Sequence, residues 1–295
     1  MKSPRFSAKL YVPEEFLGVE SGSGQAGGRS VRTRFQVSSG EILKIMRPIT
    51  NLLAATIALA AFQAAASESA RDIVKAAIDQ WRGSTSRGVI TMKIHRPDWE
   101  RTMTLRSWTR GDDESLVRVT KPRRDAGNAT LAKKGSMWTY SPKVNRVIKI
   151  PSSMMNRNWM GSDFSNKEIS RSDDIVDQYD HKLLETRRSR GREVYVIQSI
   201  PHEEAAVVWG SEVLKIRDDN IVLEHAFYDQ DGAHVKSLLT LAIGKSGGRT
   251  IATRQRMAKV EVEDEWTEIR VEEMEFDVQL RDILFTLSNL QNPRE

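Results

Sequence analysis

Apolar and charged residues alternate along most of the chain after Gly83, and this alternation predicts β-strands. Near the C-terminus, for example, Val271, Met274 and Phe276 are separated by glutamates. Because successive side chains of a strand point to opposite faces, the pattern gives each strand one apolar and one polar face. Strand-like stretches of this kind cover residues 88–95, 100–110, 114–120, 129–135, 136–141, 144–150, 192–200, 212–218, 220–229, 234–243, 250–264 and 266–278.

Short turn signals separate these stretches and indicate antiparallel neighbours. Examples are Gly111-Asp112-Asp113, Arg190-Gly191 and Gly247-Gly248. The simplest arrangement is one antiparallel sheet of ten or more strands that curls on itself. The concave apolar face of so large a sheet has to close, stack on another layer or be capped. Its interior then either admits a ligand or is filled by helices and loops.

One amphipathic helix precedes the strands. Apolar residues recur at helical spacing over residues 70–81, ending at Trp81. Ser69 and Asp72 have the spacing of a capping box, and Gly83 is a natural stop signal. This helix is the first candidate to fill the interior of the sheet.

The second candidate is the stretch 153–170, which carries bulky apolar residues on a loop-like background of Asn, Ser and Gly. Ser165 and Glu168 form an S-x-x-E capping box, which predicts a short helix over 166–170, and Gly161 frees the backbone just before it. The apolar side chains of Trp159, Met160 and Phe164 could then project from a lid over the mouth of the sheet. Alternatively, they simply fasten the loop to the core.

Two polar residues of the same stretch, Ser162 and Asp163, have two possible roles. They either satisfy backbone groups in the turn before the lid helix, or they contact the head group of a lipid.

The charge distribution argues against nucleic-acid binding. The chain has 45 Lys/Arg and 40 Asp/Glu; eight of the basic and four of the acidic residues lie in residues 1–66, which leaves 37 basic and 36 acidic side chains in the remainder. That remainder is nearly neutral and has no run of more than two adjacent basic residues. A nucleic-acid-binding protein needs a net basic face, so we expect no nucleic-acid partner.

Residues 46–66 have the features of a secretory signal peptide. Lys44 and Arg47 precede an apolar run over 52–62, and Ala64-Ala65-Ala66 fits the small-residue cleavage pattern. The apolar run is shorter than the ~20 residues of a membrane-spanning helix. A membrane anchor or a buried helix is the alternative interpretation.

If the signal is real, the chain divides into three parts. Residues 1–45, rich in Gly, Ser and Arg, are a disordered or non-native leader, residues 46–66 are the signal peptide, and residues 67–295 form a single soluble domain outside the cytoplasm. The chain contains no cysteine, so it forms no disulfide.

No motif in the sequence indicates an enzyme. H-E-x-x-H, G-x-S-x-G, P-loop and G-x-G-x-x-G motifs are missing, and metal-ligand spacing is not found among the histidines, which are His95, His181, His202, His225 and His234. Two carboxylates could still converge in space, as in a glycosidase, without a signature in sequence spacing. We therefore expect a non-enzymatic protein with no metal and no cofactor.

The central part of the chain resembles the outer membrane lipoprotein-sorting protein family, relatives of the periplasmic carrier LolA and of LolB-like lipid-binding domains. The matching residues are Pro122, Gly127, Leu131, Trp138, Tyr140, Pro142, Arg146, Ile150 and the block Gly161-Ser162-Asp163-Phe164. Thinner similarity extends over residues 70–290 and includes Tyr195, Pro201, Gly232, Lys236, Met257, Thr267 and Phe285. The family more often has an aromatic residue and an aspartate where Asn166 and Glu168 stand here.

This resemblance implies an unclosed antiparallel β-barrel, a half-pipe, whose hydrophobic cavity is covered by the N-terminal helix and a short lid helix. It implies a carrier of lipid or lipoprotein acyl chains in the periplasm of a Gram-negative-type envelope, monomeric, with a membrane transporter or an outer-membrane receptor as further partner. The expected cavity and lid residues are Trp108, Trp138, Tyr140, Ile150, Met155, Trp159, Met160, Phe164 and Phe227, with Gly161, Ser162 and Asp163 as the lid motif.

A second function fits the same fold. The protein could be a periplasmic sensor or adaptor that binds a membrane-protein partner and transports nothing. Four basic residues flank the lid and could meet anionic lipid head groups or an acidic partner surface: Arg146, Lys149, Arg157 and Lys167.

Overall fold

The computed structural model describes residues 69–170, 174–205 and 207–294. The predicted signal peptide and leader lie outside these residues. The helices are α2 (Ala70–Arg82), α3 (Asn166–Ser170), α4 (Asp174–Asp177) and α5 (Leu287–Gln291), with 3-10 turns η2 (Ser152–Met154) and η3 (Asp282–Phe285). The strands are β1 (Thr85–Arg96), β2 (Trp99–Arg110), β3 (Glu114–Lys121), β4 (Ala129–Lys133), β5 (Ser136–Ser141), β6 (Arg146–Lys149), β7 (Tyr179–Ser189), β8 (Arg192–Pro201), β9 (Ser211–Arg217), β10 (Val222–Tyr228), β11 (His234–Ser246), β12 (Arg249–Lys259) and β13 (Trp266–Phe276).

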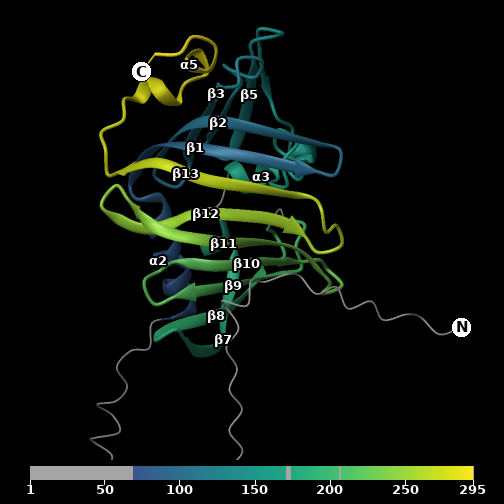
Figure 1. Ribbon diagram of the computed structural model, residues 1–295, viewed down its shortest axis with the longest axis vertical. Coiled ribbons are helices and arrows are strands. Elements are labelled where there is room, and N and C mark those ends of the chain that lie inside the picture. Colours follow the sequence, from purple (N-terminus) through teal and green to yellow (C-terminus); the bar gives the residue numbers. More distant parts are fainter. Residues whose placement is uncertain (1–68, 171–173, 206, 295) are drawn as a thin grey trace, which may run out of the picture. The chain divides into compact units, whose positions relative to one another are not determined.

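All of these strands form one antiparallel sheet of 13 strands, and the sheet is not closed into a barrel (Figure 1). The strand order is β6-β5-β4-β3-β2-β1-β13-β12-β11-β10-β9-β8-β7. The sheet therefore consists of two meanders that join where β1 pairs with β13, from Ser86↔Phe276 to His95↔Trp266. The predicted fold, a mainly β half-pipe of ten or more strands with helical covers, is confirmed.

The strand order explains why the lid stretch is apolar. Strands β6 and β7 follow each other in sequence but lie at opposite edges of the sheet. The chain from 150 to 178 therefore has to travel from one edge of the half-pipe to the other. Apolar side chains along this connection can pack on the strands it crosses, which is the physical reason for bulky residues on a loop.

Both predicted helix starts are confirmed in detail. The Ser69 hydroxyl accepts a hydrogen bond from the Asp72 backbone N–H at 3.2 Å, and Gly83, at φ 64°, ends α2. At α3 the capping box is reciprocal: the Glu168 N–H donates to Ser165 Oγ at 3.1 Å, and the Ser165 N–H donates to Glu168 Oε2 at 3.0 Å.

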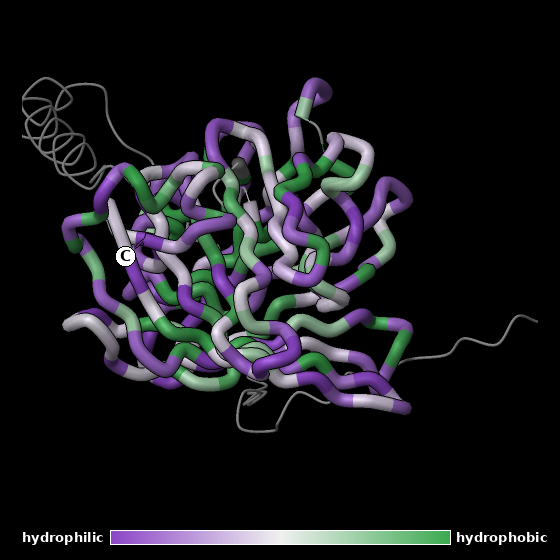
Figure 2. The backbone as a smooth tube through the Cα atoms, turned by 90° about the horizontal axis from the view of Figure 1, so that it is seen from above, coloured by the Kyte–Doolittle hydropathy of each residue, from purple (hydrophilic) through white to green (hydrophobic). Residues whose placement is uncertain are grey.

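Strand β7 was not predicted from the sequence. It is an edge strand, and almost all of its residues are exposed, including Leu183 and Leu184. A strand with neither face buried has no reason to alternate apolar and polar residues, so the pattern that revealed the other strands is missing here. Along most other strands hydrophobic and hydrophilic residues alternate. Figure 2 shows hydrophobic (green) and hydrophilic (purple) positions interspersed along the chain.

The two faces of the sheet are covered by different segments. The lid and α2 lie on the concave face. On the convex face of β3 to β6 lies the C-terminal segment with η3 and α5. Side chains of the sheet hold this segment by its backbone: Arg118 donates to the carbonyls of Asn289 and Leu290 at 2.6 and 3.1 Å, and Lys133 donates to that of Phe285 at 3.1 Å. Within the described residues, no helix has the length and apolarity needed to span a membrane.

Candidate functional site

The lid motif is a tight turn that places Ser162 inside the protein. Met160 and Gly161 both have positive φ values, 52° and 81°, so the chain reverses between Trp159 and Phe164, whose backbones bond at 2.7 Å. Glycine adopts this left-handed conformation without steric cost. The fully buried Ser162 hydroxyl donates to the Trp159 carbonyl at 2.7 Å and accepts from the Phe164 N–H at 3.3 Å. Ser162 therefore satisfies backbone groups of the turn.

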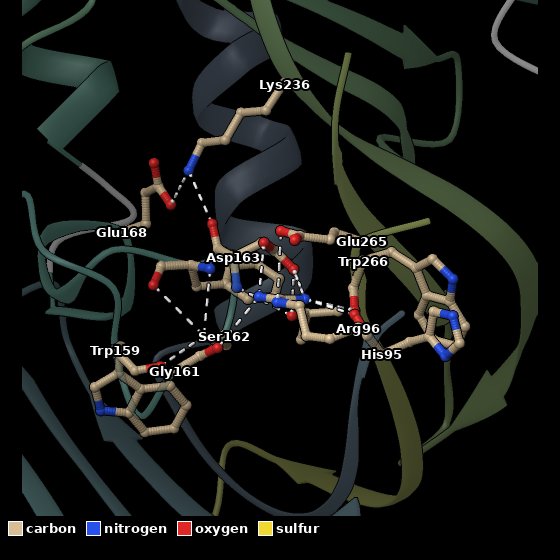
Figure 3. A network of polar contacts seen from close by, with 12 residues as sticks. His95, Arg96, Trp159, Gly161, Ser162, Asp163, Glu168, Lys236, Glu265 and Trp266 are labelled. Carbon is tan, nitrogen blue, oxygen red and sulfur yellow. Dashed lines mark hydrogen bonds and ion pairs between the residues drawn. The ribbon is translucent and has the colours of Figure 1, made fainter. Parts of the chain in front are cut away.

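Asp163 anchors the same turn to the middle of the sheet. Its carboxylate accepts hydrogen bonds from both terminal nitrogens of Arg96, at 3.0 and 3.1 Å (Figure 3). It also accepts one from the hydroxyl of Thr267, at 2.6 Å. The Asp163 N–H in turn donates to the Thr267 hydroxyl at 3.0 Å. Arg96 ends β1 and Thr267 lies near the start of β13, so the lid is fixed where the two meanders meet. Two parallel charge-assisted bonds are among the strongest polar contacts in proteins.

A second polar anchor joins the lid to β11. The Lys236 ammonium donates to Glu168 Oε2 at 2.8 Å and to the Asp163 carbonyl at 3.1 Å (Figure 3). It also lies over the rings of Trp209 and Phe227, at 5.3 and 5.2 Å from their centroids. The Lys236 side chain is only 7% exposed, so these contacts replace water as its surroundings. The other oxygen of Glu168, Oε1, is buried and has no hydrogen-bond donor in the described part of the chain.

The apolar side chains of the lid divide between two clusters. Trp159 packs with Met155 and Met160 against the concave side of β1 to β5, and its indole N–H donates to Thr130 Oγ1 at 3.0 Å. Phe164 instead packs with Phe227 and Met257, in the meander of β7 to β13. The lid thus fills one half of the half-pipe with Trp159 and borders the other half with Phe164.

A cavity of about 470 Å³ lies between α2, the lid and the concave face of the sheet; most of its wall comes from the meander of β7 to β13, and it extends to β1, β2 and β3. Binding sites for small molecules commonly have volumes of about 300–1,000 Å³ and largely apolar walls. Apolar residues make up most of the wall and include Ile78, Trp81, Ile90, Phe164, Ile169, Val207, Trp209, Leu214, Phe227, Leu238, Ile251, Met257, Ile269 and Met274. The interior of the sheet therefore holds both a plug and an open space.

Most charged residues of the cavity wall lie near the lid, whereas Arg82, Ser86 and Thr109 line the wall near the end of α2. Glu212 accepts hydrogen bonds from the Tyr179 hydroxyl and contacts Nε2 of His225, whose ring stacks on Phe227 with centroids 4.3 Å apart. Lys236 and Glu168 border the same part of the wall. Every one of these groups has at least one polar partner, so a ligand would meet a wall whose charges are already largely paired.

The structure brings only some of the predicted site residues to this cavity. Asp163, Phe164 and Phe227 line it. Ile150, Met155, Trp159 and Met160 pack instead in the neighbouring cluster, and Met160 borders a separate hollow of about 350 Å³ between β2, β4 and β5. Gly161 and Ser162 shape the turn.

Trp108, Trp138 and Tyr140 lie on the opposite face of the sheet. Ser107 and Thr109 line the cavity, so Trp108 between them points to the convex side, where it packs against the C-terminal residues Leu284 and Phe285. Trp138 and Tyr140 belong to the same cluster. The alternation of residues along a strand does not show which face of the sheet is concave. Aromatic residues in the sequence therefore do not by themselves predict which side chains line the cavity.

Sequence reasoning missed several cavity residues, notably Trp81, Trp209, Lys236 and Glu212. The alternation of β11 and β12 could have grouped Leu238 with Met257 on one face, but only the three-dimensional strand order shows that this face is covered by the lid. In the described part of the chain, no group of three or more His, Asp or Glu side chains is arranged to hold a metal ion.

Comparisons with known proteins agree with this architecture. A family model whose description reads "Uncharacterized protein" matches residues 111–292. A search of curated proteins found no match. The solved structure of a DUF1329 family protein from Desulfovibrio piger is 25% identical, with a TM-score of 0.69, and the alignment covers 75% of this chain and 97% of that one.

Two further solved structures share the fold. An outer membrane lipoprotein-sorting protein domain from Vibrio parahaemolyticus is 21% identical with a TM-score of 0.65, over 76% of this chain and all of that one. A LolA superfamily protein from Nitrosomonas europaea is 20% identical with a TM-score of 0.63, over 75% of this chain and 99% of that one. The chain thus belongs to the family of the model that matches residues 111–292, and it shares its fold with the lipoprotein-sorting protein domain and the LolA superfamily protein.

Proposed function

We propose that this protein is a periplasmic carrier that binds a lipid, or the acyl chain of a lipoprotein, and passes it toward the outer membrane or a transporter. The observation that carries the proposal is the largely apolar cavity of about 470 Å³ beneath the lid. Burial of each CH2 group of an acyl chain contributes about 0.8 kcal/mol, so an apolar hollow holds such a chain without any catalytic group. In this proposal the protein is not an enzyme.

The lid supports loading and release through its position. Phe164 and Ile169 form part of the cavity wall and belong to a segment that only crosses the sheet and adds no strand to it. Its polar anchors, Arg96 and Lys236, lie in the sheet, so a lid movement would exchange a few specific contacts and leave the strand pairing intact. Uptake then depends on lid movement, and release depends on a receiver with higher affinity for the cargo.

The cellular location follows from the N-terminal pattern. We include in the proposal that residues 46–66 direct export, that residues 1–45 are a leader, and that the mature carrier, residues 67–295, acts as a monomer in the periplasm. The solved structure from Vibrio parahaemolyticus, described as a lipoprotein-sorting protein domain, supports this assignment through its fold alone.

The test is extraction of a fluorescent-acyl phospholipid from vesicles by the purified protein. Leu238 lines the cavity, whereas its neighbour Leu239 is half-buried and is not part of the wall. We expect Leu238→Trp to reduce extraction at least tenfold by filling the cavity, and Leu239→Trp to extract as the wild type does, because alternate residues of a strand face opposite sides. Equal extraction by a folded Leu238→Trp variant would contradict the carrier proposal.

A second candidate function, an adaptor that docks on a membrane protein, is favoured by one surface. Three apolar side chains in and next to the edge strand β6 are exposed, namely Val144, Ile148 and Met154. The exposed basic residues Arg146 and Lys149 alternate with them. A mixed apolar and basic surface of this kind suits an acidic protein surface better than it suits water.

The two functions are separable by variants of these two regions. Ile148→Glu with Met154→Glu alters the β6 surface and leaves the cavity wall unchanged. If the protein is an adaptor, this double variant abolishes its cellular activity and Leu238→Trp does not. If the protein is a carrier, Leu238→Trp loses cellular activity although its β6 surface is intact.

A further inference from the structure

Two lysines face each other on the concave side of the sheet, at the lid end of the cavity. Lys236 of β11 pairs directly with Lys259 of β12, and Phe227 of β10 pairs with Lys236 on the other side. Directly paired residues of antiparallel strands have Cβ atoms about 4.5–5.5 Å apart on the same face. All three side chains line the cavity.

This pairing is electrostatically unfavourable unless the charges are neutralised, because like charges on directly opposed positions repel. Lys236 is neutralised by Glu168, at 2.8 Å. For Lys259, the residues that the structure describes provide no carboxylate or hydrogen-bond acceptor within contact distance.

The acidic groups of the wall are already paired with other residues. Asp163 is bound by Arg96, and Glu168 by Lys236. Glu212 is contacted by His225 and by the Tyr179 hydroxyl. Among the residues that the structure describes, no side chain balances the charge of the Lys259 ammonium group at the lid end of the cavity. A charge beside an apolar wall interacts more strongly with a counter-ion than it would in water.

The opposite end of the cavity, toward the C-terminal half of α2, is mainly apolar. Trp81 of α2 packs with Ile251 and Met274 there. Arg82, at the end of α2, also lines the wall, and its guanidinium donates to the Gly111 carbonyl at 2.8 Å. A ligand whose charged end lies under the lid would place its hydrocarbon against α2, where Trp81, Ile251 and Met274 form an apolar part of the wall.

We propose that Lys259 is the head-group site of the cavity and binds the anionic group, a carboxylate or a phosphate, of an amphiphile whose hydrocarbon chain occupies the α2 end. This inference rests on the proposed carrier function and specifies the class of its cargo. The remaining N–H of the Lys236 ammonium, which uses two donors for Glu168 and Asp163, is available to the same group.

The test compares ligands that share one hydrocarbon chain and differ in the head group. Dodecanoate, dodecyl phosphate, dodecanol and dodecyltrimethylammonium each compete with an uncharged phenylnaphthylamine dye for the purified protein, below their micelle-forming concentrations. The first two separate a carboxylate from a phosphate as the source of the anion. The variants are Lys259→Met, Lys259→Arg and, as matched control, Lys245→Met, which removes an exposed lysine of β11 that does not line the cavity.

We expect the wild type to bind at least one of the two anionic ligands about tenfold more tightly than dodecanol, and the cationic ligand most weakly. Lys259→Met should lose the tenfold preference and keep its affinity for dodecanol, whereas Lys259→Arg and Lys245→Met should keep the preference.

Two results overturn the inference. If dodecanol binds the wild type as tightly as both anions do, or if Lys259→Met keeps the preference, the head-group site is wrong while the carrier function stands. If none of the four ligands displaces the dye, dodecanol included, the carrier function itself fails and the head-group site fails with it.

Discussion

Arg96 and Asp163, which are 67 residues apart in sequence, form a bidentate ion pair. The two terminal guanidinium nitrogens of Arg96 donate to the two carboxylate oxygens of Asp163, at 3.0 and 3.1 Å. The pair joins the last residue of β1 to the lid turn, and Thr267 of β13 completes it at 2.6 Å. The Asp163 side chain is fully buried and that of Arg96 is 11% exposed. The lid is therefore held at the junction of the two meanders, beside the cavity that the proposed cargo would enter.

Loss of one charge of this pair should be costly. Asp163→Asn leaves the buried Arg96 guanidinium with only the more distant and more exposed Glu265 as counter-ion, and removing one partner of a buried ion pair typically costs about 3–5 kcal/mol. Urea unfolding measures the loss. The matched control is Glu265→Gln: Glu265 lies 3.6 Å from the same guanidinium but is more exposed, so its loss should cost less than about 1 kcal/mol. Equal losses for the two variants would show that Asp163 does not anchor the lid.

The second anchor should behave as a coupled pair. Lys236→Met leaves the Glu168 carboxylate buried beside apolar rings, so we expect a loss of about 3–5 kcal/mol in the free energy of unfolding. Adding Glu168→Gln removes the stranded charge, and the double variant should be more stable than the sum of the two single losses implies. A double-mutant cycle by urea unfolding checks this. Strict additivity would mean that the two side chains contribute independently.

The two apolar parts of the lid should have separable effects. Trp159→Phe removes the N–H bond to Thr130 and some packing, which should cost about 1–3 kcal/mol of stability but leave ligand affinity unchanged, because Trp159 does not line the cavity. Phe164→Leu reshapes the cavity wall and should change the affinity for an acyl-chain ligand several-fold. Dye displacement on both variants measures this. If Trp159→Phe alters the affinity for the acyl-chain ligand as much as Phe164→Leu does, then Trp159 and Phe164 do not have separate roles.

Stability should depend on pH through His95. Hydrogen bonds to Glu100, and then to Asp264, raise the pKa of His95 above its usual value of 6.5. A raised pKa in the folded state adds stability at pH values below the unfolded pKa, and this contribution disappears as the pH rises through the folded pKa. The wild type should therefore lose stability relative to His95→Gln as the pH rises from the usual histidine pKa of 6.5 through the raised pKa of the folded state. Parallel pH profiles of urea midpoints for the two proteins would contradict this.

Local features of the fold were predictable because they depend on neighbours in sequence. Alternation revealed all strands except β7, and the capping residues Ser69 and Ser165 located the helix starts within one residue. Strand β7 escaped because an edge strand exposed on both faces has no alternation to detect.

The candidate site was harder to predict because it depends on contacts between distant residues. Nothing in the local sequence distinguishes Trp108, on the convex face under the C-terminal segment, from Phe227 in the cavity. The partners of Asp163 and Glu168 come from β1, β11 and β13, and only the folded sheet brings them together. The lid turn itself was recognisable, whereas its anchors were not.

The most direct test of the carrier account is native mass spectrometry of the mature protein purified from the cell envelope without detergent. The account predicts an added mass that corresponds to one lipid or one acylated polypeptide, present in the wild type and in Leu239→Trp and lost in Leu238→Trp. A wild-type protein that is free of any added mass, and that stays so after incubation with envelope lipids, would contradict it.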